Sequence, residues 1–301
     1  MISILIPTYD YDITKLVHEL VKQCQSAQIV FEIICQDDDS KSDLNLKNNS
    51  INSIEFCHFY SNSENFGRSK NRNTLAQKSN YDWLLFLDCD MIPVSENFIQ
   101  NYVKTIDNCN SEIVFGGVEY QANRPPKAQL LRWVYGKKRE TKSVEQRTKS
   151  ENISTLTSNF LIKKDLLIAH PFDEQLTEYG FEDYAFFSAL EKEKKEVKHI
   201  DNPCFHNGLE TSSEFLSKTK MAIQNLVYLS NHKNTLVKQT ELVRTYQKIS
   251  RLQLQKMVIL FFNVFKKSIE KNLSSNFPSL FLFDLYKLGW YCVLMRNQAL
   301  K

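Results

Sequence analysis

Glycine and proline are scarce in this chain of 301 residues, with 7 of each, and neither low-complexity linkers nor internal repeats occur. No Gly-x-Gly-x-x-Gly motif follows the first apolar run, which argues against a nicotinamide-dependent dehydrogenase. The 7 cysteines are odd in number and include no Cys-x-x-Cys pair, so we expect neither a disulfide framework nor a zinc site. A reducing compartment fits this cysteine usage best.

Long uncharged apolar runs are also missing, and no segment approaches the ~20 residues that a membrane-spanning helix needs. The N-terminus has neither the basic region nor the cleavage site of a signal peptide. A net charge of +3 is too small to indicate a nucleic-acid partner. These features predict a cytoplasmic protein without nucleic acid, and they leave room for contact with the inner face of a membrane.

Short β-rich runs alternate with amphipathic stretches through the first two thirds of the chain. Strands are expected at residues 2–6, 29–35, 54–60, 83–87, 112–119, 159–162 and 197–200. Helices are expected at residues 12–25, 68–78, 96–108 and 183–194. This alternation predicts a layered α/β domain with a largely parallel sheet. Because the chain becomes helix-prone near its last third, we place a catalytic domain at 1–210 and a helical region at 211–301.

Polar clusters follow three of the expected strands, namely Pro7-Thr8-Tyr9, Asp37-Asp38 and Asp88-Cys89-Asp90. Parallel strands end at the same edge of a sheet, where open α/β sheets bind ligands, so we expect one site there. Carboxylates at i and i+2 can reach one hard cation, which a leaving nucleoside diphosphate needs. Asp37 and Asp38 are explained equally well by an Asx turn after a strand.

The next expected helix begins with Arg68, Lys70 and Arg72. Basic side chains at a helix N-terminus suit a diphosphate, although a solvated helix face explains scattered lysines as well.

Taken in order, these segments resemble family 2 of the glycosyltransferases, whose fold is GT-A. The first strand and its turn, residues 3–9, are similar to the family's donor-binding turn, and Asp37 to Ser40 resembles its Asp-Asp-Gly-Ser turn. Residues 65–67 and 71–73 resemble its Asn-x-Gly and Ala-Arg-Asn segments, and residues 83–90 resemble the strand that ends in the metal-binding Asp-x-Asp. Asp39 replaces the usual glycine and Asn71 the usual alanine. The resemblance covers about residues 1–210 and implies a GT-A, Rossmann-like mixed sheet with a C-terminal helical extension.

The resemblance also implies roles for individual residues. The donor would be bound by Pro7, Thr8, Tyr9, Asp37, Asp38, Arg72 and Asp88. A divalent metal, Mn²⁺ or Mg²⁺, would be held by Asp90, Asp88 and His206. For His206, a loop histidine bonded to backbone is the alternative explanation. The segment Tyr179 to Asp183 is similar to the family's Gly-x-Glu-Asp, which makes Asp183 the expected general base and Glu182 an acceptor-binding residue.

An acidic pair at a helix start is also an ordinary capping arrangement, since the helix dipole favours carboxylates there. A single base that deprotonates an acceptor hydroxyl supports in-line attack, which inverts the anomeric centre. A double displacement would need a nucleophile that forms a covalent sugar intermediate, and the sequence offers no sign of one.

Two aromatic residues are candidates for binding the acceptor sugar. Trp133 and Tyr135 are expected to line an acceptor site together with Asn159, although both aromatics fit the core of one amphipathic helix equally well. Near the C-terminus, Phe261, Phe265 and the adjacent Lys266 and Lys267 combine apolar and basic character. Either an interfacial helix on an anionic membrane or a packing helix would show this pattern.

The sequence therefore predicts an inverting hexosyltransferase that moves a sugar from a nucleoside diphosphate sugar to a saccharide or lipid-linked saccharide. The resemblance implies UDP as the nucleotide and bacterial surface polysaccharide as the product. Two other classes stay open. A sugar-nucleotide-forming nucleotidyltransferase would open with a glycine-rich phosphate loop, which residues 7–10 lack, and a silent binding protein would be favoured by loss of Asp90 or Asp183, which are both present.

Overall fold

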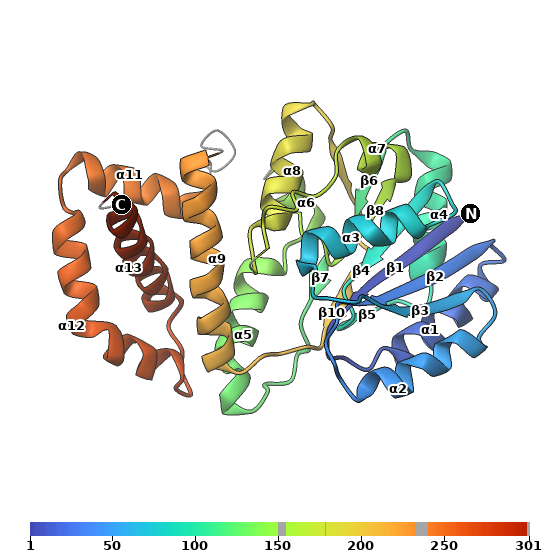
Figure 1. Ribbon diagram of the computed structural model, residues 1–301, viewed down its shortest axis with the longest axis horizontal. Helices are drawn as coiled ribbons and strands as arrows, with labels where there is room; N and C mark the ends of the chain where they lie inside the picture. The colour runs from blue at the N-terminus through green and yellow to red at the C-terminus, as the bar shows by residue number, and fades with distance from the viewer. Residues whose placement is uncertain (150–154, 178, 233–239, 300–301) are drawn as a thin grey trace. The chain divides into compact units, whose positions relative to one another are not determined.

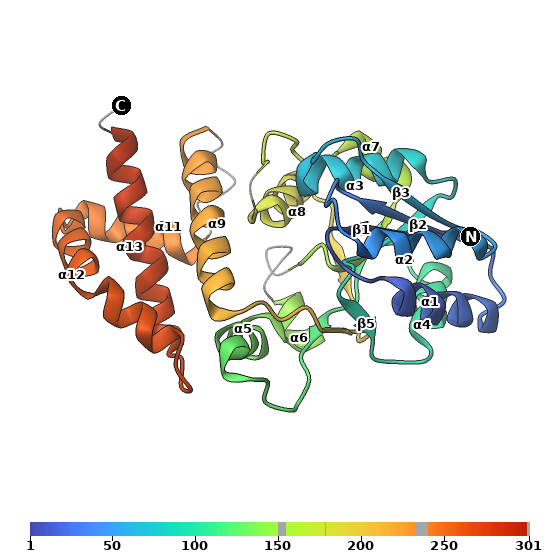
Figure 2. The same ribbon diagram turned by 60° about the horizontal axis from the view of Figure 1, so that its bottom comes forward.

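The computed structural model describes residues 1–149, 155–177, 179–232 and 240–299 (Figures 1 and 2). The chain divides into two compact units. The first unit comprises Met1–Gln121, Glu140–Thr177 and Glu182–Gly208. The second comprises the described residues of Ala122–Arg139, Glu178–Phe181 and Leu209–Lys301. The helical chain after residue 210 thus joins two earlier segments in one unit.

A seven-stranded mixed sheet forms the centre of the first unit, in the order β3-β2-β1-β4-β8-β6-β9 (Figure 1). Its strands are β1 Ile2–Thr8, β2 Phe31–Asp37, β3 Cys57–Ser61, β4 Trp83–Leu87, β6 Ile113–Phe115, β8 Asn159–Lys163 and β9 Val197–His199. The four neighbouring strands β3, β2, β1 and β4 are all parallel to one another. Strand β8 is antiparallel to both of its neighbours, β4 and β6. All but the edge strands are almost continuously buried, as their apolar runs require.

Helices cover both faces of this sheet. They are α1 Thr14–Ser26, α2 Leu44–Asn48, η1 Asn49–Ser53, α3 Gly67–Lys78, α4 Phe98–Asn108, α6 Val144–Thr148, α7 Lys164–Ala169 and α8 Glu182–Lys192. Figure 2 shows α3 and α7 on one face and α1 and α4 on the other. In α1 the buried Leu16, Val17 and Leu20 follow the helical spacing that the sequence predicts.

Stacked phenylalanine rings hold α8 against the sheet. Phe86 of β4 and Phe160 of β8 stack with their ring centroids 5.1 Å apart. Phe172, which follows α7, stacks on Phe186 of α8 at 4.1 Å. Aromatic pairs of this kind contribute about 0.5–1.5 kcal/mol beyond the area they bury. The packing therefore fixes the start of α8 relative to the strands.

A second, three-stranded sheet in the first unit has the order β5-β10-β7. Its strands are β5 Met91–Pro93, β7 Val118–Glu119 and β10 Cys204–His206. The single strand expected at residues 112–119 is wrong, because the chain divides into β6 and β7 at Gly116 and Gly117. Gly117 has φ +101°, a conformation that side chains rarely adopt, and a Cβ there would meet the Arg147 guanidinium at 3.0 Å.

The second unit is helical. Its elements are η2 Lys127–Gln129, α5 Leu130–Tyr135, the turn η3 Gly136–Glu140 that leads back to the first unit, α9 Ser212–His232, α11 Glu241–Arg251, α12 Gln255–Leu273 and α13 Leu280–Ala299. Its core joins Leu131 of α5 to Phe215 of α9, Phe262 of α12 and Phe283 of α13. A Cβ on Gly289 would lie 2.2 Å from the Phe262 ring, so this glycine lets α12 and α13 approach closely. None of the helices in the described ranges is long and apolar enough to cross a membrane.

Candidate active site

The segments that follow β1, β2 and β4 meet at one edge of the large sheet. Thr8 and Asp37 are register partners at the ends of β1 and β2, and the Asp38 amide donates to the Thr8 carbonyl at 3.0 Å. β4 pairs with β1 in parallel, with Phe86 opposite Leu5, which sets the segment after β4 beside this turn. The structure therefore brings together the three polar clusters that the sequence places at strand ends.

Pro7 and Tyr9 flank the buried Thr8 in this turn. The Thr8 hydroxyl donates to the Ile6 carbonyl at 3.2 Å, and Tyr9 is largely exposed. Asp37 is fully buried, and its carboxylate accepts from the Ser40 amide at 3.0 Å and from the Ser40 hydroxyl at 2.6 Å. Asp37 thus builds the Asx turn that the sequence allowed, and its contact with a nucleoside stays a prediction.

Asp38 organises the entry to α3. Its carboxylate accepts from the side chain of Asn62 and from the backbone amides of Phe66 and Gly67, each at 2.8 Å. The turn is held in one conformation because three donors converge on one buried carboxylate. Arg68 follows directly, so Asp38 places the first basic side chain of α3 at this edge of the sheet.

Arg72 links the strand end to α8. Its buried guanidinium has Nη2 2.9 Å from Asp88 Oδ1 and Nη1 3.7 Å from Glu182 Oε1. Arg68 reaches the same Glu182 oxygen at 3.4 Å. Burial alone would raise the pKa of Asp88, but the Arg72 and Arg68 guanidiniums outweigh it and hold that pKa below its usual value. Asp88 is therefore a carboxylate at neutral pH.

Asp183 stands beside Glu182 in the first turn of α8. Burial, followed by repulsion from the Glu182 carboxylate, raises the pKa of Asp183 to about 7, against the opposing pull of Arg72 and Arg68. A carboxylate whose pKa lies near the working pH suits general-base catalysis. Arg72 and Arg68 lower the pKa of both Asp183 and Asp88, so the two guanidinium groups act electrostatically on both carboxylates.

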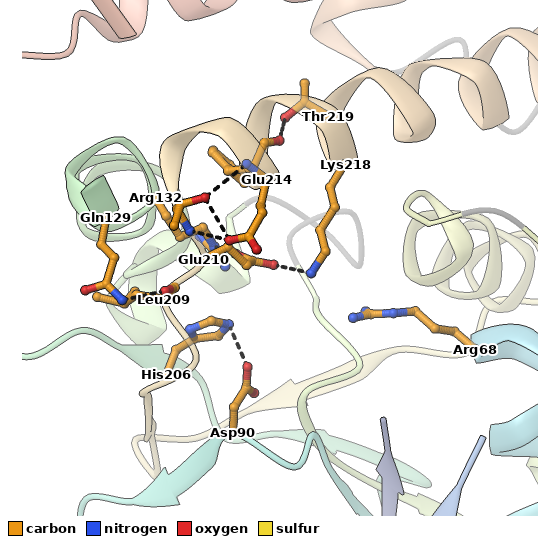
Figure 3. A network of polar contacts seen from close by, with 12 residues as sticks. Arg68, Asp90, Gln129, Arg132, His206, Leu209, Glu210, Glu214, Lys218 and Thr219 are labelled. Atoms are coloured by element: carbon orange, nitrogen blue, oxygen red, sulfur yellow. Dashed lines mark hydrogen bonds and ion pairs between the residues drawn. The ribbon is translucent and has the colours of Figure 1, made fainter. Parts of the chain in front are cut away.

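Asp90 and His206 face each other at one end of the small sheet (Figure 3). His206 Nε2 lies 3.5 Å from Asp90 Oδ2. Antiparallel pairing of β5 with β10 sets His206 opposite Met91, and the Asn207 amide donates to the Asp90 carbonyl at 2.9 Å. The Tyr120 ring stacks on the imidazole with centroids 5.4 Å apart. Strand pairing and stacking thus orient His206 toward Asp90.

Gly208 lies beside the Asp90 carboxylate. A Cβ at that position would lie 2.1 Å from Asp90 Oδ2, which is closer than any non-bonded contact allows. The absence of a side chain therefore keeps the space beside the Asp90 carboxylate open.

A divalent cation fits the groups present at Asp90 and His206. Carboxylate oxygen and imidazole nitrogen are both ligands that Mn²⁺ accepts. Within the described ranges, no three or more His, Cys, Asp or Glu side chains gather as a metal-binding group. Magnesium and manganese sites often use one or two protein ligands and take the rest from substrate phosphates and water. Asp88 is the third expected ligand; its Oδ1 lies 2.9 Å from Arg72 Nη2, and its contact with a metal stays a prediction.

Asn159, an expected acceptor residue, lies in the interior. Its amide nitrogen donates to the carbonyls of Gly117 at 2.8 Å and Asn202 at 3.0 Å, and its oxygen accepts from the Tyr102 hydroxyl at 2.7 Å. The side chain is fully buried. These hydrogen bonds connect β8 to the segments before β7 and β10, so Asn159 stabilises the fold.

Trp133 and Tyr135 lie in α5, which belongs to the second unit. Tyr135 packs against Phe215 and Phe283 with centroid distances of 5.4 and 5.5 Å, in line with the core explanation given above. Trp133 is half-buried, and the Lys137 ammonium lies 4.9 Å from its ring centroid.

Sequence reasoning missed Tyr120 and Gly208, and for Arg68 it left open both a diphosphate contact and a solvated helix face. Gly208 carries a signal, because it is one of only 7 glycines and follows His206 by two positions. Arg68 is separated from Glu182 by more than a hundred positions, and Tyr120 from His206 by more than eighty. Only the folded chain reveals those contacts.

Comparisons with known proteins identify the family and the fold. The family model described as Glycosyl transferase family 2 matches residues 3–169. No curated protein sequence matches the chain. Among solved structures, S. aureus TarS 1-349 in complex with UDP-GlcNAc is similar with a TM-score of 0.53 and 16% identity, over 99% of this chain and 91% of that one. The mannosyltransferase PcManGT from Pyrobaculum calidifontis, in complex with GDP-Man and Mn²⁺, is similar with a TM-score of 0.60 and 11% identity, over 99% of this chain and 86% of that one. The expected GT-A fold is confirmed.

Proposed function

The chain belongs to glycosyl transferase family 2, and we propose that it transfers a sugar from a nucleoside diphosphate sugar to a carbohydrate acceptor with inversion. One observation carries the proposal: Arg72 contacts both Asp88 at the strand end and Glu182, the neighbour of the base Asp183. Cations for a diphosphate and a base for an incoming hydroxyl are thereby joined in one unit.

The donor lies at the edge of the sheet where β1, β2 and β4 end. Arg68 extends from the N-terminus of α3, and its side chain is 45% exposed, so it can reach a diphosphate oxygen. The helix N-terminus adds a favourable field for the same anion. UDP is the nucleotide we propose. Structural neighbours bind UDP-GlcNAc in one case and GDP-Man in another, and both donors carry the diphosphate that these groups suit.

Asp90 and His206 would hold the divalent cation in this proposal, with Asp88 close by. When bound, the cation would supply positive charge to the diphosphate of the leaving group. Gly208 keeps the approach to Asp90 free for it. The mannosyltransferase neighbour contains Mn²⁺ with its donor, which supports Mn²⁺ as the first cation to test.

Asp183 is the general base. Its carboxylate takes the proton from the acceptor hydroxyl while that oxygen attacks the anomeric carbon. The bond from the anomeric carbon to the diphosphate oxygen breaks on the opposite face, and the nucleoside diphosphate leaves with the electron pair. One displacement of this kind inverts the anomeric centre. Glu182 is buried and held by Arg72 and Arg68, so it keeps the α8 N-terminus and the base in place beside the acceptor.

A saccharide, free or linked to a lipid, is the acceptor class we propose, within the assembly of a surface polysaccharide. Trp133 and Tyr135 on α5 offer aromatic faces of the kind that stack on sugar rings, and Trp133 is the more accessible candidate because Tyr135 packs into a core.

A donor screen with Mn²⁺ tests the proposal, with free nucleoside diphosphate as the readout. We expect release of UDP from a UDP-sugar and its loss in Asp90→Ala. Release of pyrophosphate from a nucleoside triphosphate and a sugar phosphate would instead indicate a nucleotidyltransferase. Donor binding without any turnover, across the donors and a panel of saccharide acceptors, would indicate a silent binding protein and would contradict the proposal.

A further inference from the structure

Helix α12 presents apolar side chains on two faces. One face, with Ile259, Phe262 and Ile269, is buried, and its phenylalanine packs against α13. The other face is turned to solvent in the part of the chain that the structure describes. Its members, with their exposed fractions, are Met257 65%, Leu260 67%, Phe261 47%, Val264 64% and Phe265 45%. We call these five residues the outer stripe.

The outer stripe is continuous. Its members follow one another at i, i+3, i+4, i+7 and i+8, so they line a single side of the helix. The rings of Phe261 and Phe265 contact each other with centroids 4.6 Å apart. Single exposed apolar residues are ordinary, but a contiguous apolar patch indicates a binding surface.

Basic residues accompany the stripe. Residues 240–299 contain nine Lys or Arg against three Asp or Glu, a net charge of +6, whereas the rest of the chain has 29 against 32, a net charge of −3. All of the positive excess therefore lies in the last described segment. On α12 itself the exposed Lys256, Lys267 and Lys271 flank the outer stripe on one side.

We propose that α12 docks on the surface of an anionic lipid bilayer, with its outer stripe in the interface and its lysines at the headgroups. An apolar face beside a basic one is what an interfacial helix requires, and the 19 residues of α12 lie along the surface rather than across it. Each lysine near an anionic surface adds to the attraction. A second copy of the chain fits less well, because a two-fold contact would bring the same positive charges together.

Flotation with lipid vesicles tests this proposal on the full chain. Vesicles of equal parts phosphatidylglycerol and phosphatidylcholine should carry the protein upward in a density gradient, and vesicles of phosphatidylcholine alone should not. We expect Phe261→Gln with Phe265→Gln to lower the partition coefficient about tenfold or more. Lys267→Gln with Lys271→Gln should lower it roughly 30-fold at low salt.

A matched control removes exposed apolar residues elsewhere. Leu46 in α2 and Ile168 in α7 are both well exposed in the first unit, so Leu46→Gln with Ile168→Gln should float like the parent. The proposal is overturned if the parent stays at the bottom of the gradient with anionic vesicles, or if the phenylalanine variant floats equally well. It is also overturned if light scattering shows a dimer that the phenylalanine variant abolishes while neither protein binds vesicles. Flotation needs no sugar transfer, so its outcome is independent of the proposed reaction.

Discussion

The two units differ in what they bury and in what they expose. The first unit buries charged groups, with Arg72 at 1% exposure, Glu182 at 4% and Asp38 at 6%. The second unit buries Arg132, at 6% exposure, beside a core that is largely apolar, and its helix α12 also exposes the outer stripe to solvent. Buried charges are costly unless they are paired, and exposed apolar patches are costly unless they are covered. The first unit is therefore unusual in its buried charges, and the second in its exposed apolar side chains.

This difference separates two kinds of function. Paired and buried charges hold one geometry, which suits the binding of a diphosphate and the removal of a proton. An exposed stripe is suited to a large surface with little shape of its own. Substitutions in the two units should therefore fail in different assays, and the following experiments test that separation in order of expected effect.

Asp183→Asn should lower the transfer rate by about 10²–10⁴-fold, since it removes the general base. Donor binding, measured by calorimetry, should stay near the parental value. Asp165→Asn is a matched control, because Asp165 is also an acidic residue in the first turn of a helix but is exposed. Transfer by Asp183→Asn at the parental rate would mean that another group is the base.

Arg72→Gln should lower the free energy of unfolding by about 3 kcal/mol, because it leaves the buried Glu182 and the half-buried Asp88 without their cation. Urea unfolding measures this change. Arg68→Gln is the comparison, and since the Arg68 side chain is 45% exposed it should cost about 1 kcal/mol or less. Equal losses of unfolding free energy in the two variants would show that the buried ion pairs of Arg72 stabilise the fold no more than the exposed pair of Arg68.

Gly208→Ala should weaken Mn²⁺ binding in the presence of UDP by about 10–100-fold, as changes around metal ligands commonly do. The added Cβ must displace the Asp90 carboxylate from its place. Electron paramagnetic resonance of free Mn²⁺ provides the readout. Asn207→Ala is the control, because its backbone bond to Asp90 survives the change. Unaltered affinity in Gly208→Ala would remove Asp90 from the metal site.

The pH profile of kcat/KM should rise about tenfold per pH unit up to about 7, because Asp183 must lose its proton to act. The same raised pKa, compared with 3.8 for an ordinary aspartate, means that the folded state binds this proton more tightly. Folding is therefore weakened as the pH rises from about 4 to about 7. Asp183→Asn should be more stable than the parent at about pH 8, with the gap closing toward pH 4. A flat profile with no such gap would contradict the assignment.

Substitution of the outer stripe should have the smallest effect on folding. Phe261→Gln with Phe265→Gln should change the free energy of unfolding by no more than about 1 kcal/mol, as exposed positions generally allow. Transfer to a water-soluble acceptor should be unchanged. A large loss of stability would show that these rings are packed in a core, which would contradict the exposure of the outer stripe.

Strand ends were the most predictable part of the molecule. The apolar runs before Thr8, Asp37 and Asp88 are buried strands in register, so their polar successors had to meet at one edge. The pairing of β5 with β10 could not be read in the same way, because strands of three residues have no periodicity. His206 was therefore placed by resemblance and Gly208 was missed.

Long-range charge contacts were also beyond sequence reasoning. Arg68 and Arg72 look like one basic helix face, yet the first is half exposed and the second is buried beneath it. The Arg72 guanidinium lies 5.7 Å from the centroid of the Phe172 ring, a contact across a hundred positions that the sequence does not reveal. For Asn159 the sequence suggested a contact with the acceptor. The side chain lies in the core, where it forms hydrogen bonds with Tyr102, Gly117 and Asn202.

Paramagnetic broadening by Mn²⁺ and UDP tests the central claim most directly, with Mg²⁺ and UDP as the diamagnetic reference. We expect the backbone amide signals of residues 88–90 and 206–208 to broaden more strongly than those of Ile2 and Ser3, which lie at the other end of β1 in the same unit. Broadening that leaves both of these segments untouched and appears elsewhere in the chain would contradict the account.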